Sequence, residues 1–226
     1  MRAALDRQAR VAIAEGAHFR GSVDMQRKGA AFDALYDVRA VRVLVDTIEH
    51  NEDYTVWTFT LREGIKFHDG TDLTSQVVAD NINNWRGDPA TVAKSGRSPL
   101  LFKFIFQNIK SVDVVDPLTV KLTMGTPWPG FPDYLAHGRL GIMAESQMNS
   151  PDCATKLVGT GPFQLISWQR NDIMKLEKNK SYWRKDKDGV QLPYLDKLNF
   201  KPIEGGPQRF DALAGGTVQA IHTSSQ

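Results

Sequence analysis

The sequence predicts a mixed α/β fold in which short strands and hairpins alternate with short helices. Three stretches of the 226-residue chain indicate it: an alternating apolar segment at residues 54–61, an amphipathic segment at 73–85, and a hairpin pattern at 109–124. Alternation is typical of a half-buried strand, whereas apolar spacings of three and four residues indicate a helix. No repeated strand–helix–strand rhythm and no repeat of solenoid period is visible in the sequence.

The first fifty residues give weaker signals. Residues 3–15 predict a short helix, because apolar residues recur there among alanine, arginine and glutamine. Residues 16–30 are rich in glycine and charge, which indicates a loop. Residues 40–49 fit a strand or a helix, since their periodicity does not decide between the two.

The clearest strand signal lies at residues 54–61. Trp57, Phe59 and Leu61 alternate with smaller and hydroxyl-bearing residues, so one face is bulky and apolar. The pair Asp69-Gly70 then predicts a turn, because both residues tolerate positive φ.

A helix is expected after that turn. Either Asp72 or Thr74 can cap its first turn, and Gly87-Asp88-Pro89 is expected to end it. The expected buried face consists of Val77, Val78, Asn81, Ile82 and Trp85. Residues 90–103 then indicate a loop that leads to a further helix or strand.

The remaining elements are short. Residues 109–115 and 118–124 flank Asp116-Pro117 and predict a hairpin. The three prolines of residues 125–133 are expected to prevent regular structure there. Further strands are expected at 163–168, 173–177 and 195–203, with a turn at 169–172, and short helices at 132–138, at 144–149 and from Pro207 to Gly215-Gly216.

Composition limits the functions that the chain can have. Lys and Arg total 28 against 26 Asp and Glu, a formal net charge of +2, and no basic run or aromatic–basic ladder is present. A nucleic-acid partner is therefore not expected. The single cysteine, Cys153, leaves no disulfide within the chain and no multi-cysteine zinc site. The sequence contains no run of 18 apolar residues, so no membrane span is predicted. Residues 1–20 carry too many charges for a secretory signal.

No motif predicts an enzyme. The sequence contains no GxSxG, no HExxH and no cysteine in a catalytic signature, and nothing singles out a pair among its many carboxylates. His68-Asp69 could be a metal or acid–base pair, but neighbours on a strand point to opposite faces, and Asp69 already belongs to a turn. The other histidines are scattered, so neither a metal site nor a cofactor is expected.

The segment Gly159-Thr160-Gly161-Pro162 allows several interpretations. It could be a phosphate loop, but it lacks the Lys-Ser/Thr ending, and Pro162 stands where a donor N–H is needed. A crossover turn with closely packed backbone fits better, and such a turn can also line a cleft. Most aromatic residues in or beside loops are expected to pack in the core, while one or two, Trp168 among them, are candidates to stack on a ligand.

Four segments in order resemble one protein family. Residues 54–70 (YTVWTFTLREGIKFHDG) are similar to the signature of the extracellular solute-binding proteins that serve ABC importers of oligopeptides, dipeptides and nickel. The family's next three landmarks resemble three later segments: residues 158–163 (VGTGPF), residues 179–197 with NKSYW and LPYLDK, and residues 209–216 (RFDALAGG). The resemblance covers residues 54–222.

The resemblance implies a fold of the periplasmic-binding-protein type, class II, which closes on its ligand between two lobes. It implies that residues 1–50 are a divergent part of the first lobe, that 51–154 form a small α/β insert domain, and that 155–226 return to the first lobe. The second ligand-gripping lobe lies further along in the family and has no counterpart here, so the chain would be an amino-terminal fragment with an incomplete lobe.

The resemblance also implies a function. The chain would be the substrate-binding component of an ABC transporter, a periplasmic or extracellular protein of a family that includes lipoproteins, and it would pass peptides or a similar small solute to membrane permease subunits. The expected ligand-binding residues are Gly159, Thr160, Gly161 and Trp168, with no catalytic residue and no metal. The alternative is a truncated interaction module that self-associates through the surface left by the missing lobe.

Overall fold

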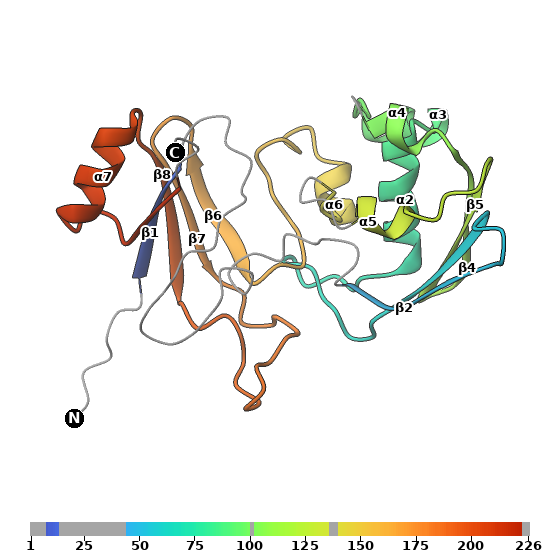
Figure 1. Ribbon diagram of the computed structural model, residues 1–226, viewed down its shortest axis with the longest axis horizontal. Helices are drawn as coiled ribbons and strands as arrows, with labels where there is room; N and C mark the ends of the chain where they lie inside the picture. The colour runs from blue at the N-terminus through green and yellow to red at the C-terminus, as the bar shows by residue number, and fades with distance from the viewer. Residues whose placement is uncertain (1–7, 14–43, 100–101, 136–139, 223–226) are drawn as a thin grey trace. The chain divides into compact units, whose positions relative to one another are not determined.

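The computed structural model describes residues 8–13, 44–99, 102–135 and 140–222. The chain divides into two compact units (Figure 1). The continuous unit comprises Asp37–Thr160, and the discontinuous unit comprises Met1–Tyr36 together with Gly161–Gln226. None of the described helices is both long and apolar enough to cross a bilayer.

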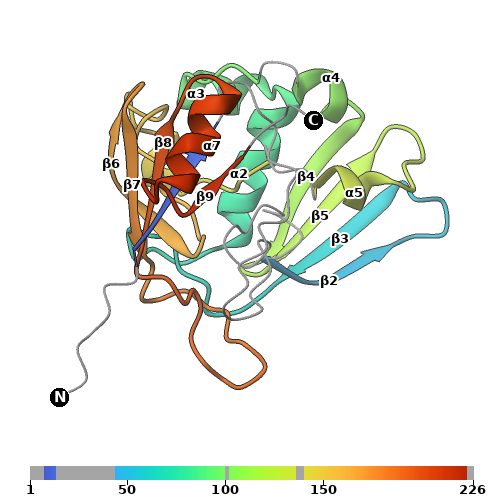
Figure 2. The ribbon, with the colours of Figure 1, turned by 60° about the vertical axis from the view of Figure 1, so that its left-hand side comes forward.

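The continuous unit is built on an antiparallel sheet of four strands in the order β2-β3-β5-β4, which Figure 2 shows side by side. The strands are β2 (Val45–His50), β3 (Val56–Leu61), β4 (Ile109–Asp116) and β5 (Thr119–Met124). The predictions of a strand at 54–61 and of a hairpin at 109–124 are confirmed. In β3 the residues Trp57, Phe59 and Leu61 are buried in alternation, as the sequence indicated.

Five helices belong to the same unit within the described ranges: α2 (Ser75–Arg86), α3 (Pro89–Ser95), α4 (Phe102–Phe106), α5 (Phe131–Leu135) and α6 (Glu145–Met148). Helix α2 packs on β4 and β5 (Figure 1). Phe59, Phe106 and Phe131, all fully buried, form the centre of the unit's core, with ring centroids of neighbouring pairs 5.9 and 6.4 Å apart.

The caps explain where α2 begins and ends. Thr74 is the N-cap, and its side chain accepts a hydrogen bond from the Val77 N–H at 3.4 Å. Asp72, the other candidate cap, instead forms an ion pair with Lys66. Gly87 ends the helix in the left-handed conformation, at φ 77°, which glycine adopts without strain. Four of the five residues expected on the buried face are buried, and Val77 is half-buried.

Two expected loops contain helices. Residues 90–103 were predicted as a loop, but α3 fills much of that range because Asp88 accepts a hydrogen bond from the Thr91 N–H at 2.9 Å and Pro89 occupies the first turn. Residues 125–133 were expected to be irregular and 132–138 to form a short helix. Helix α5 begins at Phe131, so the helix is confirmed for residues 132–135, while residues 136–138 lie outside the described residues. Pro132 stands in its first turn, where the missing N–H costs no helical hydrogen bond.

The discontinuous unit contains a five-stranded sheet in the order β6-β7-β8-β1-β9. Its elements are β1 (Gln8–Ile13), β6 (Phe163–Gln169), β7 (Ile173–Lys178), β8 (Lys197–Pro202), α7 (Gly206–Ala214) and β9 (Ala220–Ile221). The first three strands are antiparallel, whereas β1 runs parallel to both β8 and β9. The three predicted strands, the turn at 169–172 and the helix from Pro207 are confirmed.

The prediction of a helix at residues 3–15 is wrong for residues 8–13. These residues form β1, the strand between β8 and β9. Pairing on both sides gives the segment ladder hydrogen bonds that a short isolated helix lacks, and such tertiary pairing overrides weak local preference. Residues 40–49 were expected to be either strand or helix, and residues 45–49 are strand. Residues 40–43 lie outside the described residues.

The two compact units have other bounds than the domains that the family resemblance implies. The resemblance places residues 45–50 in the amino-terminal segment, whereas β2 pairs with β3, for example Ile48 with Phe59, and lies in the continuous unit. That unit extends to Thr160, beyond the expected end at residue 154. The correspondence of the two units to a first lobe and an insert domain stays a prediction.

Candidate ligand-binding site

The expected ligand-binding loop is anchored in the continuous unit by His68. The Gly159 N–H donates to His68 Nδ1 at 3.3 Å, and the Gly159 carbonyl accepts from the His68 N–H at 2.9 Å. Thr160, the next residue, is buried. One histidine therefore satisfies both backbone groups of a glycine 91 positions away.

The neighbouring Asp69 has a structural part as well. Its carboxylate accepts hydrogen bonds from the Thr71 N–H, the Thr71 hydroxyl and the Ser146 hydroxyl. Partial burial raises the pKa of Asp69, but the hydrogen bonds from Ser146 and Thr71 outweigh it and hold this pKa below its ordinary value. Within the described ranges, no group of three or more His, Cys, Asp or Glu side chains is placed to hold a metal ion.

Replacing His68 with leucine is expected to loosen the loop. The substitution leaves the Gly159 N–H without its acceptor, a loss of about 1–3 kcal/mol for a shielded donor. Amide hydrogen exchange at Gly159 is expected to become at least about tenfold faster, since 1.4 kcal/mol corresponds to a factor of ten. His68→Asn is the matched control, because its side-chain oxygen can replace Nδ1. Equal exchange in the wild type and in His68→Leu would contradict this role.

In the discontinuous unit the continuation of the loop is anchored by Asn179. Its side-chain N–H donates to the Gly161 carbonyl at 3.0 Å, and its backbone N–H donates to the Pro162 carbonyl at 2.8 Å. Its side-chain oxygen accepts from the Ser181 N–H at 3.0 Å. Asn179 is 6% exposed. The sequence marked this residue only as part of a resemblance, and its role as an anchor was missed.

Trp168 lies on β6, the edge strand of the five-stranded sheet. Its side chain is 40% exposed, and the Arg170 guanidinium lies 5.8 Å from the centre of its ring. In the strand register Trp168 pairs with Met174, which in turn pairs with Phe200, so these three residues share one face of the sheet. The exposed ring remains available for stacking on a ligand.

The four expected residues therefore divide between the units. Gly159 and Thr160 belong to the continuous unit, and Gly161 and Trp168 to the discontinuous one. Three of them are consecutive in one loop with anchored backbone, while Trp168 follows on the next strand. Their contact with a ligand stays a prediction.

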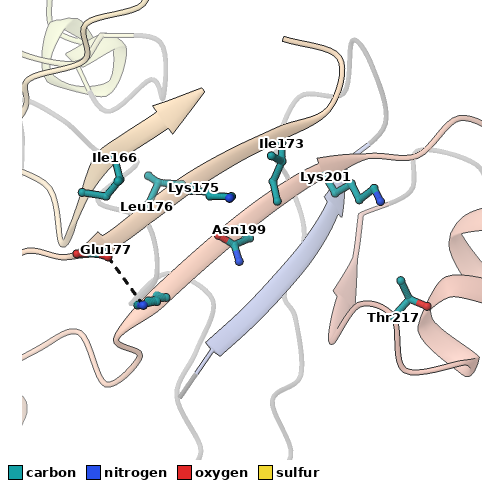
Figure 3. Close-up of a pocket in the computed structure, with 9 residues that line it drawn as sticks. Ile166, Ile173, Lys175, Leu176, Glu177, Asn199, Lys201 and Thr217 are labelled. Carbon is teal, nitrogen blue, oxygen red and sulfur yellow. Dashed lines mark ion pairs between the residues drawn. The ribbon is translucent and has the colours of Figure 1, made fainter. Parts of the chain in front are cut away.

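A pocket of about 420 Å³ lies on the five-stranded sheet (Figure 3). The strand register places its β7 and β8 side chains on the face opposite Trp168. Side chains from alternate positions of β7 and β8 line it: Ile173, Lys175, Glu177, Lys197, Asn199 and Lys201. Three of these side chains are cationic and one is anionic, so the pocket has a positive balance. The sequence did not indicate this pocket.

Comparisons with known proteins agree with this architecture. Residues 39–226 match the family model of bacterial extracellular solute-binding proteins, family 5, middle part. The glutathione-binding protein GsiB of Salmonella paratyphi A is 30% identical over 185 residues, which cover 81% of this chain and 34% of the relative. The GsiB protein of Escherichia coli K12 matches over the same shares. The chain thus spans about a third of the length of these curated relatives.

Two solved structures show the same fold at low sequence identity. MoaA from A. tumefacien R10, in complex with mannopinic acid, has a TM-score of 0.71 at 20% identity and covers 97% of this chain and 45% of its own. The periplasmic binding protein DppA from Helicobacter pylori, in complex with the peptide STSA, has a TM-score of 0.70 at 22% identity, with coverages of 93% and 45%. The fold is therefore that of a periplasmic binding protein of class II, covered in part.

The family model matches most of the chain. The chain belongs to family 5 of the bacterial extracellular solute-binding proteins. The family resemblance drawn from the sequence is confirmed.

Proposed function

We propose that the chain is the substrate-binding component of an ABC importer and captures a peptide or a similarly small solute. The observation that carries this proposal is the family match across residues 39–226. The names of relatives support a peptide-like solute: one is called glutathione-binding, and another was solved with a peptide. The partners would be the permease subunits of the importer, and the site of action the periplasm or the cell exterior.

In this proposal the protein holds a solute by noncovalent contacts and does not change it chemically. The backbone of residues 159–162 is held by hydrogen bonds to His68 and to Asn179, so a solute that packs against this loop does not have to order it first. The exposed ring of Trp168 offers a flat apolar surface that accepts varied side chains. Gly159, Thr160, Gly161 and Trp168 would thus combine polar and stacking contacts, and neither role requires a catalytic group or a cofactor.

Saturation-transfer NMR on the 226-residue chain tests the proposal, because it detects weak binding. Glutathione, short peptides, a nickel–histidine chelate and a neutral sugar serve as probes. A peptide or glutathione is expected to give a saturable signal, and Trp168→Ala is expected to weaken it at least about fivefold, near 1 kcal/mol. Val115→Ala, an exposed apolar residue of the other unit, is the matched control. No saturable signal from any peptide at several millimolar would overturn the proposal.

A further inference from the structure

The pocket on the five-stranded sheet is lined by the largely buried residue Asn199. Asn199 is 6% exposed, and no hydrogen bond joins its side-chain amide to any residue that the structure describes. The amide atoms are not among the shielded polar atoms without a partner, so they meet solvent in the pocket and can exchange it for a ligand. The amide of Asn199 lines the pocket, between Lys175 and Lys201 (Figure 3).

The strand register explains why these three side chains converge. Lys175 on β7 is paired with Asn199 on β8, and Lys201 follows Asn199 by two positions. Paired residues and residues two apart on a strand share a face of the sheet. Neighbouring side chains of this kind start about 5–7 Å apart, a span that suits one small anion with several oxygens.

The charges around the amide are unbalanced. Lys197 forms an ion pair with Glu177 at 4.0 Å, which neutralises that end of the pocket. Neither Lys175 nor Lys201 has an acidic partner among the residues of the described ranges. Two uncompensated ammonium groups therefore flank a neutral donor in a space of about 420 Å³.

We propose that this pocket is a second binding site, which takes a small di- or tricarboxylate. Ammonium and amide N–H groups donate to carboxylate oxygens, and such charge-assisted bonds are the stronger class. Ile166 and Ile173 line the remaining wall, so the ligand also has a short carbon chain to bury. The site is separate from Trp168, which lies on the other face of the sheet.

Calorimetry with citrate and succinate at low ionic strength tests the proposal on the 226-residue chain. One saturable site is expected, weaker in added salt because the lysines are partly solvated. The double variant Lys175→Gln/Lys201→Gln is expected to bind at least about tenfold more weakly, near 1.4 kcal/mol. Lys180→Gln, which removes one charge from the same unit outside the pocket, is expected to change affinity less than about twofold.

Asn199→Leu separates binding from folding. Leucine branches at the same carbon with the same number of heavy atoms and has no polar group, so the thermal midpoint is expected to stay or rise while citrate affinity falls at least about fivefold. If Asn199→Leu does not fold, the double variant Lys175→Gln/Lys201→Gln alone tests the site. The proposal fails if the wild type shows no saturation by 10 mM citrate, about the weakest range worth testing, if the double variant binds like the wild type, or if Lys180→Gln loses as much.

The two proposed sites can fail independently. Trp168→Ala is expected to weaken peptide binding and leave citrate binding unchanged, and the lysine double variant is expected to do the reverse. If either variant lost both peptide binding and citrate binding, the carboxylate site would not be separate. If the wild type bound citrate but no peptide, the proposed function would fail and the carboxylate site would stand.

Discussion

Replacing Phe59 with alanine is expected to lower the free energy of unfolding of the continuous unit by about 3–5 kcal/mol. Phe59 is fully buried in the central strand β3, and its ring stacks on that of Phe131 at 5.9 Å. Removing the ring takes apolar surface out of the core and leaves a cavity that the rigid sheet cannot close. Few single changes in this unit are expected to cost as much.

The measurement must resolve the two units, because they can unfold separately. Amide hydrogen exchange of β3 and β5 across a urea series reports on the continuous unit alone. Thr58→Ala, on the opposite face of the same strand, is the control and is expected to cost no more than about 1 kcal/mol. A loss below about 1 kcal/mol for Phe59→Ala would show that the core is looser than its burial indicates.

Replacing Asn81 with leucine is expected to cost about 3 kcal/mol, although the number and branching of the side-chain heavy atoms stay the same. Asn81 is fully buried on α2, and its side chain accepts from the Met143 N–H at 3.0 Å and donates to the Met143 carbonyl at 2.9 Å. It also donates to the Val77 carbonyl at 2.8 Å. Leucine would leave the N–H and the carbonyl of Met143 without these partners in a place shielded from water.

The same exchange experiment measures this variant, with attention to the amides of α2 and of residue 143. Gln76→Leu makes the same chemical change on an exposed position of the same helix, and its effect is expected to stay within about 0.5 kcal/mol. Similar behaviour of the two variants would mean that the hydrogen bonds of Asn81 contribute little. A large difference between them would assign the effect to the bonds to Met143.

The local elements were predictable from sequence because their causes are local. The alternation around Phe59 and the hairpin around Asp116-Pro117 each depend on fewer than about twenty neighbouring residues, and both are confirmed. Helix α3 was missed for a different reason. Gly87-Asp88-Pro89 was interpreted only as the end of one helix, whereas Asp88 and Pro89 are also a standard start of the next.

Features that depend on distant pairing were not predictable. Residues 8–13 have no strong strand signal of their own and become a strand because β8 and β9 lie on either side. The anchoring roles of His68 and Asn179 follow from burial and from partners remote in the chain. The spacing of Asn199 and Lys201 shows that they share a face, but only the register with β7 brings Lys175 beside them.

The position of β1 has a consequence for the newly made polypeptide. Strand β1 fills a slot between two strands that are translated much later, and β8 and β9 do not neighbour each other without it. All strands of the continuous unit, by contrast, have left the ribosome well before. We expect that unit to acquire its structure during synthesis. The five-stranded sheet must wait until β8 and β9 have emerged, and pairing strands so far apart in sequence is slow.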